Sequence, residues 1–391
     1  MTIKVVHTAD LHLGKSFNFT RYFQGFKRSM DLLVAFSQIV EFAIKNKADI
    51  FLLSGDVFDK VNPSNETRVY FIRELKRLYD NGIICFAIAG NHDFPKAVAR
   101  GETVLNEVEA AGLCHVFGDP EAIEKKTIKI RGFDVNVYGK PFNPLQETAS
   151  PLENFTIKLG SGINIMMLHG AFVNGKPRGL EELPYQMQQH PIFESQLPKN
   201  LSYLALGHLH RPTIIETKEG AIVGNPGSPE TLDRTEIEYG NSFIWAEFTQ
   251  SSCKAKHISI KGRECKIFTY ELKPEIDEVT TDINHFLEHN KSKEAIAWID
   301  LTGKISEVQY RNFDMQQIIN TADNYFFAYV FDRTQLQHEK YGKIFDKYKL
   351  TSPLQAVRDY VERKMKNLSK SQQELYLKAL EKATKYFGDG A

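Results

Sequence analysis

Short, continuously apolar segments alternate with longer amphipathic segments over the first 265 residues of the chain. Uninterrupted apolar runs of this length are expected of strands that are covered on both faces. Residues 28–46 and 67–78 carry apolar side chains at helical spacing and lie between such runs. The early chain therefore predicts a βαβαβ arrangement with parallel strands. The expected strands are residues 3–6, 50–53, 83–89, 163–168 and 201–206.

The middle of the chain predicts antiparallel hairpins. Residues 128–130 and 135–138 flank a turn at Gly132, and residues 213–215 and 221–223 flank a second turn. Two apolar runs separated by a short glycine-containing turn are typical of a hairpin. The predicted fold class is therefore mixed α/β.

The pattern also predicts how the chain divides. We expect a large first domain at residues 1–265, a smaller α/β domain at 266–335 and a C-terminal part at 336–391. The C-terminal part includes a linker-like stretch up to residue 350, and two basic amphipathic helices follow it, with N-terminal signals at Ser352 and Ser371. In the smaller domain, the expected strands are 267–271, 295–301 and 326–331, and the expected helices are 282–289 and 314–320.

Composition narrows the class of protein. With 42% hydrophobic and 25% charged residues, the chain resembles average globular proteins rather than disordered ones. Lys plus Arg (49) equals Asp plus Glu (49), so a nucleic-acid site would have to be a local patch. No signal peptide or apolar run of about 18 residues is present. The four cysteines are widely spaced, which favours a reduced, cytoplasmic protein with no membrane partner.

Polar side chains of metal-binding type follow five of the predicted strands. Because ligands bind outside the carboxyl ends of strands in open α/β sheets, we expect these side chains to converge. An extended backbone would point Asp10 and His12 to one side and His7 to the other. Carboxylate, imidazole and amide ligands suit Mn²⁺, Fe²⁺ or Zn²⁺. The set is Asp10, His12, Asp56, Asp59, Asn91, His92, Asp93, His169, His208 and His210.

The segments GDVFD, GNHD and GHLH, in this order, resemble the signature of calcineurin-like metallophosphoesterases. Together with HTADLHLGKSF and GNPGSPE, they make the chain similar to the nuclease subunit of the SbcCD complex and its archaeal and eukaryotic counterparts, especially the YhaO branch. The resemblance implies a two-sheet sandwich of the αββα form, followed by a capping domain and helices that bind an ATPase.

The same resemblance implies roles for the clustered residues. Two divalent cations, Mn²⁺ foremost and otherwise Fe²⁺ or Zn²⁺, would be bound, with Asp56 bridging them. His92 would be catalytic and assist the leaving oxygen. Asp59 or Asp93 would orient His92, although Asp93 could instead cap a turn. One cation would be held by Asp10, His12 and His210, and the other by Asn91, His169 and His208.

A basic and aromatic stretch at residues 11–30 is the best local candidate for DNA contact. Cations there would bind phosphates, and exposed aromatic rings would stack on unpaired bases. The alternative is that the aromatic rings, Phe23 and Phe26 above all, pack in the core. The candidate DNA-binding residues are Lys15, Arg21, Lys27, Arg28 and the more distant Arg211.

These observations favour a Mn²⁺-dependent DNA exonuclease and endonuclease with a two-metal mechanism, acting in DNA repair. One alternative is a phosphodiesterase for cyclic nucleotides or small diesters, and another is a regulatory scaffold for a coiled-coil ATPase. Lys60 stands where protein phosphatases have an arginine, which weakens a monoesterase interpretation. The expected partners are DNA, an SbcC-like or YhaN-like ATPase bound by the terminal helices, and a second copy in a homodimer. The alternative for those helices is packing on their own chain.

Overall fold

The computed structural model describes residues 2–17, 22–94, 103–174, 184, 187–273, 275–338 and 342–343. These residues divide into two compact units. The first unit runs up to residue 266 and also takes in residues 292–298 and 326–329, which the sequence pattern placed in the smaller domain. The second unit holds residues 267–291, 299–325 and the described residues from 330 onward.

The first unit begins with a six-stranded sheet of order β14-β13-β1-β2-β3-β4. Strands β1 to β4 are parallel, and β13 and β14 add antiparallel pairs at the β1 side. Sequence analysis predicted β1, β2 and β3 but missed β4, β13 and β14. The bounds are β1 Ile3–Thr8, β2 Ile50–Ser54, β3 Ile84–Ile88, β4 His115–Phe117, β13 Ser242–Phe248 and β14 Cys253–Ser259.

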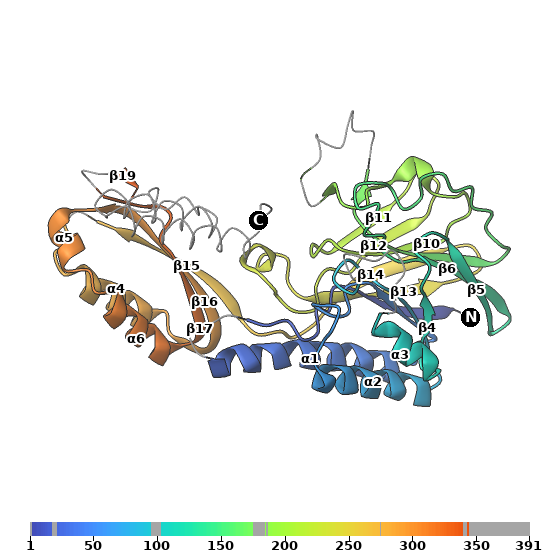
Figure 1. Ribbon diagram of the computed structural model, residues 1–391, viewed down its shortest axis with the longest axis horizontal. Helices are drawn as coiled ribbons and strands as arrows, with labels where there is room; N and C mark the ends of the chain where they lie inside the picture. The colour runs from blue at the N-terminus through green and yellow to red at the C-terminus, as the bar shows by residue number, and fades with distance from the viewer. Residues whose placement is uncertain are drawn as a thin grey trace, which may run out of the picture. The chain divides into compact units, whose positions relative to one another are not determined.

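Three helices, α1 (Tyr22–Lys45), α2 (Asn65–Asp80) and α3 (Leu105–Ala110), lie together on one face of this sheet (Figure 1). Ser64 caps α2 by accepting a hydrogen bond from the N–H of Thr67. The apolar stripes that predicted α1 and α2 face inward, and Phe36 of α1 stacks on Phe71 of α2 with ring centroids 5.6 Å apart.

A second six-stranded sheet, of order β11-β12-β10-β7-β6-β5, packs face to face against the first. Side chains such as Ile50 and Phe86 meet Val137 and Ile165 between the sheets. The two-sheet α/β sandwich and both predicted hairpins are therefore confirmed. The strands are β5 Glu124–Ile130, β6 Phe133–Lys140, β7 Ile163–His169, β10 Tyr203–Gly207, β11 Thr213–Glu216 and β12 Ile222–Asn225.

The outer face of the second sheet packs mainly against connecting segments. Leu152, Leu197 and Leu201 join Ile192 in a cluster over this face. Ile192 belongs to the small pair β8 (Phe172–Val173) and β9 (Ile192–Phe193), which the short η3 (Glu194–Gln196) follows. In the part of the chain that the structure describes, the implied αββα form thus has its long helices over the first sheet.

In the second unit, α4 (Val279–His289) and α6 (Met315–Tyr325) lie side by side (Figure 1). The strands β15, β16 and β17 are divided between the two units. The stretch predicted to be a linker begins with two short paired strands, so that interpretation is wrong for these residues. The two predicted terminal helices lie outside the described residues. The remaining elements are α5 Glu307–Arg311, β15 Cys265–Leu272, β16 Ser292–Ile305, β17 Phe326–Asp332, β18 Leu336–His338 and β19 Gly342–Lys343.

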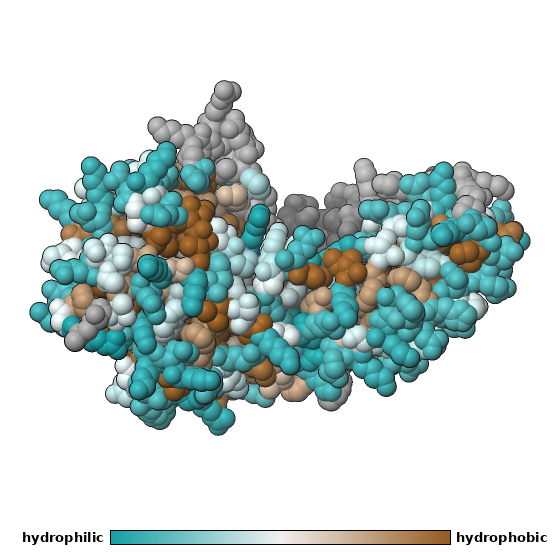
Figure 2. All heavy atoms as spheres, turned by 180° about the vertical axis from the view of Figure 1, so that it is seen from behind, coloured by the Kyte–Doolittle hydropathy of each residue, from teal (hydrophilic) through white to brown (hydrophobic). Residues whose placement is uncertain are grey.

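Among the described residues, no helix combines the length and the apolar composition that a transmembrane segment requires. On the face drawn in Figure 2, hydrophobic residues form separate patches with hydrophilic residues between them.

Candidate metal centre

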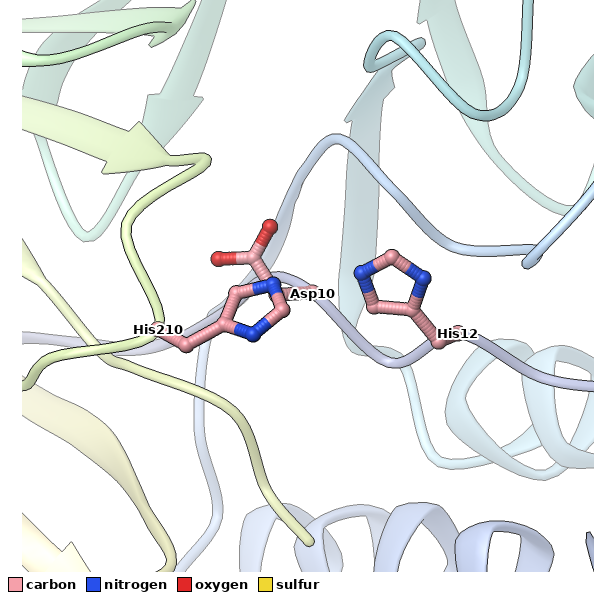
Figure 3. A group of neighbouring side chains, drawn as sticks. All are labelled: Asp10, His12 and His210. Atoms are coloured by element: carbon pink, nitrogen blue, oxygen red, sulfur yellow. The ribbon is translucent and has the colours of Figure 1, made fainter. Parts of the chain in front are cut away.

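The loops that follow β1, β2, β3, β7 and β10 bring the predicted ligands together within the first unit. Asp10 and His12 lie after β1, Asp56 after β2, and His169 ends β7. Asp10, His12 and His210 come from two different loops and turn toward a common space (Figure 3). Three overlapping groups each place their ligand atoms within 4.8 Å of one another: Asp10, His12 and His210; His12, Asp56 and His92; and Asp10, Asp56 and His169.

Asp56 lies at the centre of the cluster. Its Oδ2 is 3.6 Å from Nε2 of His12 and 3.6 Å from Nε2 of His169. Its Oδ1 accepts the backbone N–H of His92 at 2.8 Å, which fixes the rotation of the carboxylate. Asp56 is therefore within reach of both predicted groups of ligands, as a bridging carboxylate would be.

Asn91 and His208 complete the cluster. Oδ1 of Asn91 lies 3.1 Å from Nε2 of His169 and 3.2 Å from Nδ1 of His208. The backbone N–H of His208 donates to both carboxylate oxygens of Asp10 at 3.0 Å. All seven predicted ligands thus gather at one edge of the sandwich.

The backbone reaches this arrangement differently from the extended path that the sequence suggested. β1 ends at Thr8, and Asp10 and His12 have φ of 53° and 43°, in the left-handed region. Asp56 and His208 also have positive φ, 49° and 100°. Our geometric reason for pairing Asp10 with His12 was therefore wrong, although both do face the cluster. Strained backbone of this kind is common at functional sites.

His7 lies away from the cluster, as expected. Its side chain is buried within the sandwich, and its Nδ1 lies 2.8 Å from the Tyr203 hydroxyl oxygen. Burial lowers the pKa of His7 to about 3, so this imidazole is neutral.

Acceptor groups behind the imidazoles orient three of the ligands. Nδ1 of His12 donates to Asp59 Oδ1 at 3.2 Å, and Nδ1 of His169 donates to the carbonyl oxygen of Ser54 at 2.9 Å. Nδ1 of His210 donates to Glu236 Oε1 at 2.6 Å. Because carboxylates and carbonyls only accept, a proton sits on each Nδ1, which leaves Nε2 as the ring nitrogen that faces the cluster and can bind a cation once it carries no proton of its own.

Glu236 was missed by the sequence analysis. It lies in the one-turn helix η4 (Arg234–Glu236) and is buried, and its Oε2 accepts the backbone N–H of Leu232 at 2.8 Å. A single glutamate in a segment without periodic pattern carries no local signal, so only the folded chain reveals its contact with His210.

The residue that orients His92 is Asp59, but through its backbone. Nδ1 of His92 lies 2.9 Å from the carbonyl oxygen of Asp59, whereas the Asp59 carboxylate binds His12 and, at 3.3 Å, Nζ of Lys15. Asp93 accepts the backbone N–H groups of Val57, Phe58 and Gly90 instead, so its turn-capping alternative describes its contacts. The expectation that the Asp59 or Asp93 carboxylate orients His92 is therefore corrected.

Buried opposite charges dominate the electrostatics of the cluster. Burial raises the pKa of Asp10, whereas the pKa of Asp56 lies well below its usual range because His169, His12 and His92 outweigh the effect of its burial. Burial would lower the pKa of His169, but Asp56 raises it to about 9. His210 has a pKa of about 9, because Glu236 and Asp10 outweigh its burial. The carboxylates are thus arranged to stabilise positive charge between them.

The cluster fits divalent cations. Nε2 of His12 is buried and has no hydrogen-bond partner among the described residues, as expected of a lone pair reserved for a ligand. The donor atoms are imidazole nitrogens, carboxylate oxygens and one amide oxygen, a set that suits Mn²⁺, Fe²⁺ or Zn²⁺.

The candidate DNA-binding residues differ in their exposure. Arg28 is buried and forms an ion pair with buried Glu230 at 3.0 Å, so its proposed role is wrong. Lys27 and Arg211 are exposed, and the Arg211 guanidinium lies 5.5 Å from the Tyr239 ring centroid. Lys15 pairs with Asp59 beside the cluster. Arg21 lies outside the described residues.

The aromatic residues of the same stretch also differ. Phe26 is 49% exposed, contrary to the core alternative, whereas Phe17 packs against the core, with the Arg28 guanidinium 5.2 Å from its ring centroid. Nothing is described for the side chain of Phe23.

Arg28→Gln should lower the free energy of unfolding by about 3 kcal/mol, because Glu230 would remain buried without its ion-pair partner. Urea denaturation measures the change. The variant Lys45→Gln removes an equal charge from an exposed site of the same helix, α1, and should leave the urea midpoint nearly unchanged. Equal midpoints for the two variants would show that the Arg28 pair contributes little.

Comparisons with known proteins agree with this geometry. Residues 3–214 match the family model of calcineurin-like phosphoesterases. The chain is 30% identical to the DNA double-strand break repair protein Mre11 of Sulfurisphaera tokodaii over 354 residues, 87% of this chain and 84% of that protein. It is 29% identical to Mre11 of Saccharolobus solfataricus over 74% of this chain and 72% of that protein. It is 24% identical to the uncharacterized metallophosphoesterase YhaO of Bacillus subtilis over 58% of this chain and 52% of that protein.

Proposed function

Because the chain belongs to the calcineurin-like phosphoesterases, and within them to the family of the Mre11 repair proteins, we propose that it hydrolyses phosphodiester bonds of DNA with two bound divalent cations. The observation that carries this proposal is the convergence of six further ligand residues, with nitrogen and oxygen donor atoms, around Asp56. We propose manganese as the preferred cation and the repair of DNA ends in the cytoplasm as the setting.

The ligands would hold the cations as two groups joined by Asp56. Asp10, His12 and His210 would bind one, and Asn91, His169 and His208 the other. When bound, such cations polarise the phosphate and lower the pKa of a water that attacks phosphorus. Asp59, Ser54 and Glu236 hold the imidazoles of His12, His169 and His210 in the tautomer that binds metal.

His92 is placed to act on the substrate. It is exposed, and the Asp59 carbonyl oxygen accepts the Nδ1 proton, so Nε2 faces away from that contact; in the imidazolium form, with both ring nitrogens protonated, Nε2 can donate a proton to the leaving oxygen. We propose His92 as the catalytic acid. Asp59, which the resemblance grouped with the catalytic His92 as the residue that orients it, would position both His12, through its carboxylate, and His92, through its carbonyl oxygen.

Exposed residues near the start of α1 support contact with DNA. Lys27 can bind a phosphate, and Phe26 offers an exposed ring on which a base can stack. Lys15 and Arg211 complete the proposed contacts. We further propose a homodimer and a coiled-coil ATPase of the SbcC or YhaN type as partners, the latter bound through residues 352–391, on the grounds of the family.

The purified chain should degrade linear double-stranded DNA when Mn²⁺ is added, because the cations supply the charge that the phosphodiester reaction requires. DNA labelled at the 5′ or 3′ end and a cyclic nucleotide are assayed in parallel, each with and without the ATPase. EDTA should stop the reaction. Hydrolysis of the cyclic nucleotide with no cleavage of DNA would favour the small-diester alternative instead.

A further inference from the structure

The groups behind the metal ligands differ sharply between the two halves of the cluster. We call Asp10, His12 and His210 position 1, and Asn91, His169 and His208 position 2. In position 1, each imidazole donates its Nδ1 proton to a carboxylate, at 3.2 Å to Asp59 and 2.6 Å to Glu236. In position 2, His169 donates to the neutral carbonyl oxygen of Ser54 at 2.9 Å.

The direct oxygen ligands also make position 1 more negatively charged than position 2. Position 1 includes the carboxylate of Asp10, whereas the corresponding oxygen ligand of position 2 is the neutral amide of Asn91. Asp56 is shared by both positions. A cation at position 1 would therefore have the Asp10 carboxylate as a direct ligand and the Asp59 and Glu236 carboxylates behind two imidazoles. At position 2 the direct oxygen ligand is the Asn91 amide, and the Ser54 carbonyl stands behind His169.

We propose that the two positions bind their cations unequally and in order, with position 1 filled first because Asp59 and Glu236 strengthen its imidazole ligands. A carboxylate that accepts the second ring proton raises the basicity of an imidazole ligand and fixes its direction. Burial strengthens these charge interactions, since the carboxylate of Glu236 is 8% exposed and the side chain of His12 is 3% exposed.

This inference rests on the proposed two-cation centre but does not depend on the substrate. Glu236 acts here as a positioning residue, since it touches His210 and the backbone of Leu232 and not the reacting atoms. Its role is therefore visible in cation binding itself, before any DNA is added.

The test is calorimetric titration of the full metal-free chain with Mn²⁺. The wild-type chain should bind in two steps, the first at least about tenfold tighter than the second. Glu236→Gln should weaken the first step by about 10- to 100-fold and leave the second nearly unchanged, because the amide keeps the shape but loses the charge. Asn91→Ala should weaken only the second step.

A matched control comes from the same turn. Asp233 caps η4 by accepting the N–H of Thr235 at 2.6 Å and does not contact His210 in the structure, so Asp233→Asn should bind both cations like the wild type. Thermal melting of each metal-free variant verifies the fold. Should Glu236→Gln fail to fold, Asp59→Asn gives the same test, with a weaker first step expected.

Two outcomes would overturn the inference: equal affinities for both cations in the wild type, or an unchanged first step in the folded Glu236→Gln or Asp59→Asn variant. A wild type that binds Mn²⁺ in two unequal steps but leaves DNA intact would refute the nuclease proposal and not this one. A wild type that cleaves DNA but binds both cations with equal affinity would support the nuclease proposal and refute this inference.

Discussion

Replacing His92 with alanine should reduce DNA cleavage by about 10²- to 10⁴-fold while both manganese ions stay bound. The ring of His92 is exposed at the edge of the cluster, with its Nδ1 fixed by the Asp59 carbonyl oxygen at 2.9 Å. Removing it takes away the proton donor for the leaving oxygen but none of the seven proposed ligands. Single-turnover cleavage of end-labelled DNA gives the rate, and elemental analysis of the dialysed protein gives the manganese content.

The location of His92 also allows a competing role, which the same experiment decides. His92 lies within 4.8 Å of ligand atoms of His12 and Asp56, so it could bind a cation directly. Loss of one manganese per chain together with activity would assign it that role and refute ours. His285→Ala, which removes an exposed imidazole from α4 in the second unit, serves as the control and should keep full activity.

The sequence predicts the central strands and the clustering of ligands for one physical reason. Strands buried on both faces are continuously apolar, so the polar residues that end them stand out, and parallel strands bring those ends to one edge. This reasoning identified Asp56, Asn91 and His169. In the structure, Nε2 of His169 lies 3.6 Å from Oδ2 of Asp56 and 3.1 Å from Oδ1 of Asn91.

What the sequence could not reveal depends on tertiary contacts. Arg28 looked like a surface cation because it follows other basic residues, yet it reaches a carbonyl oxygen 203 positions away and is buried. Glu236 lies 26 positions from His210 in a turn without periodic pattern. The left-handed backbone at Asp10 and His12 was equally invisible: Asp and His adopt positive φ more often than most residues, but it is uncommon for any residue other than glycine, and nothing in the local sequence marks these two positions.

The glycines of the three motifs were only partly interpretable from the sequence. The segments GDVFD, GNHD and GHLH each place a glycine directly before a proposed ligand, Asp56, Asn91 or His208, and the structure shows how closely other atoms approach these glycines. A Cβ at Gly207 would lie 2.3 Å from the carbonyl oxygen of Ser54, and one at Gly55 would lie 2.2 Å from Nδ1 of His169. The sequence shows that glycine occupies these positions, but only the structure shows which atoms leave no room for a side chain there.

Gly90→Ala should reduce DNA cleavage by about 10²-fold or more and lower the manganese content. A Cβ at this position would lie 2.2 Å from Asp56 Oδ1, 2.4 Å from the Asp56 backbone nitrogen and 2.8 Å from Cε1 of His169. Because a backbone atom is among these contacts, rotating one side chain does not relieve the clash, and the bridging carboxylate must move. A displacement of about 1 Å in a catalytic group costs about 10²-fold in rate.

Gly118→Ala is the matched control for this substitution. A Cβ at Gly118 would meet no atom within 4 Å, so the same chemical change there should leave cleavage, manganese content and melting temperature close to those of the wild type. Manganese titration and melting of both variants separate a displaced ligand from a general loss of fold. A Gly90→Ala variant that melts like the wild type, binds two manganese ions and cleaves DNA at the wild-type rate would mean that Asp56 is not held in the bridging position we assign to it.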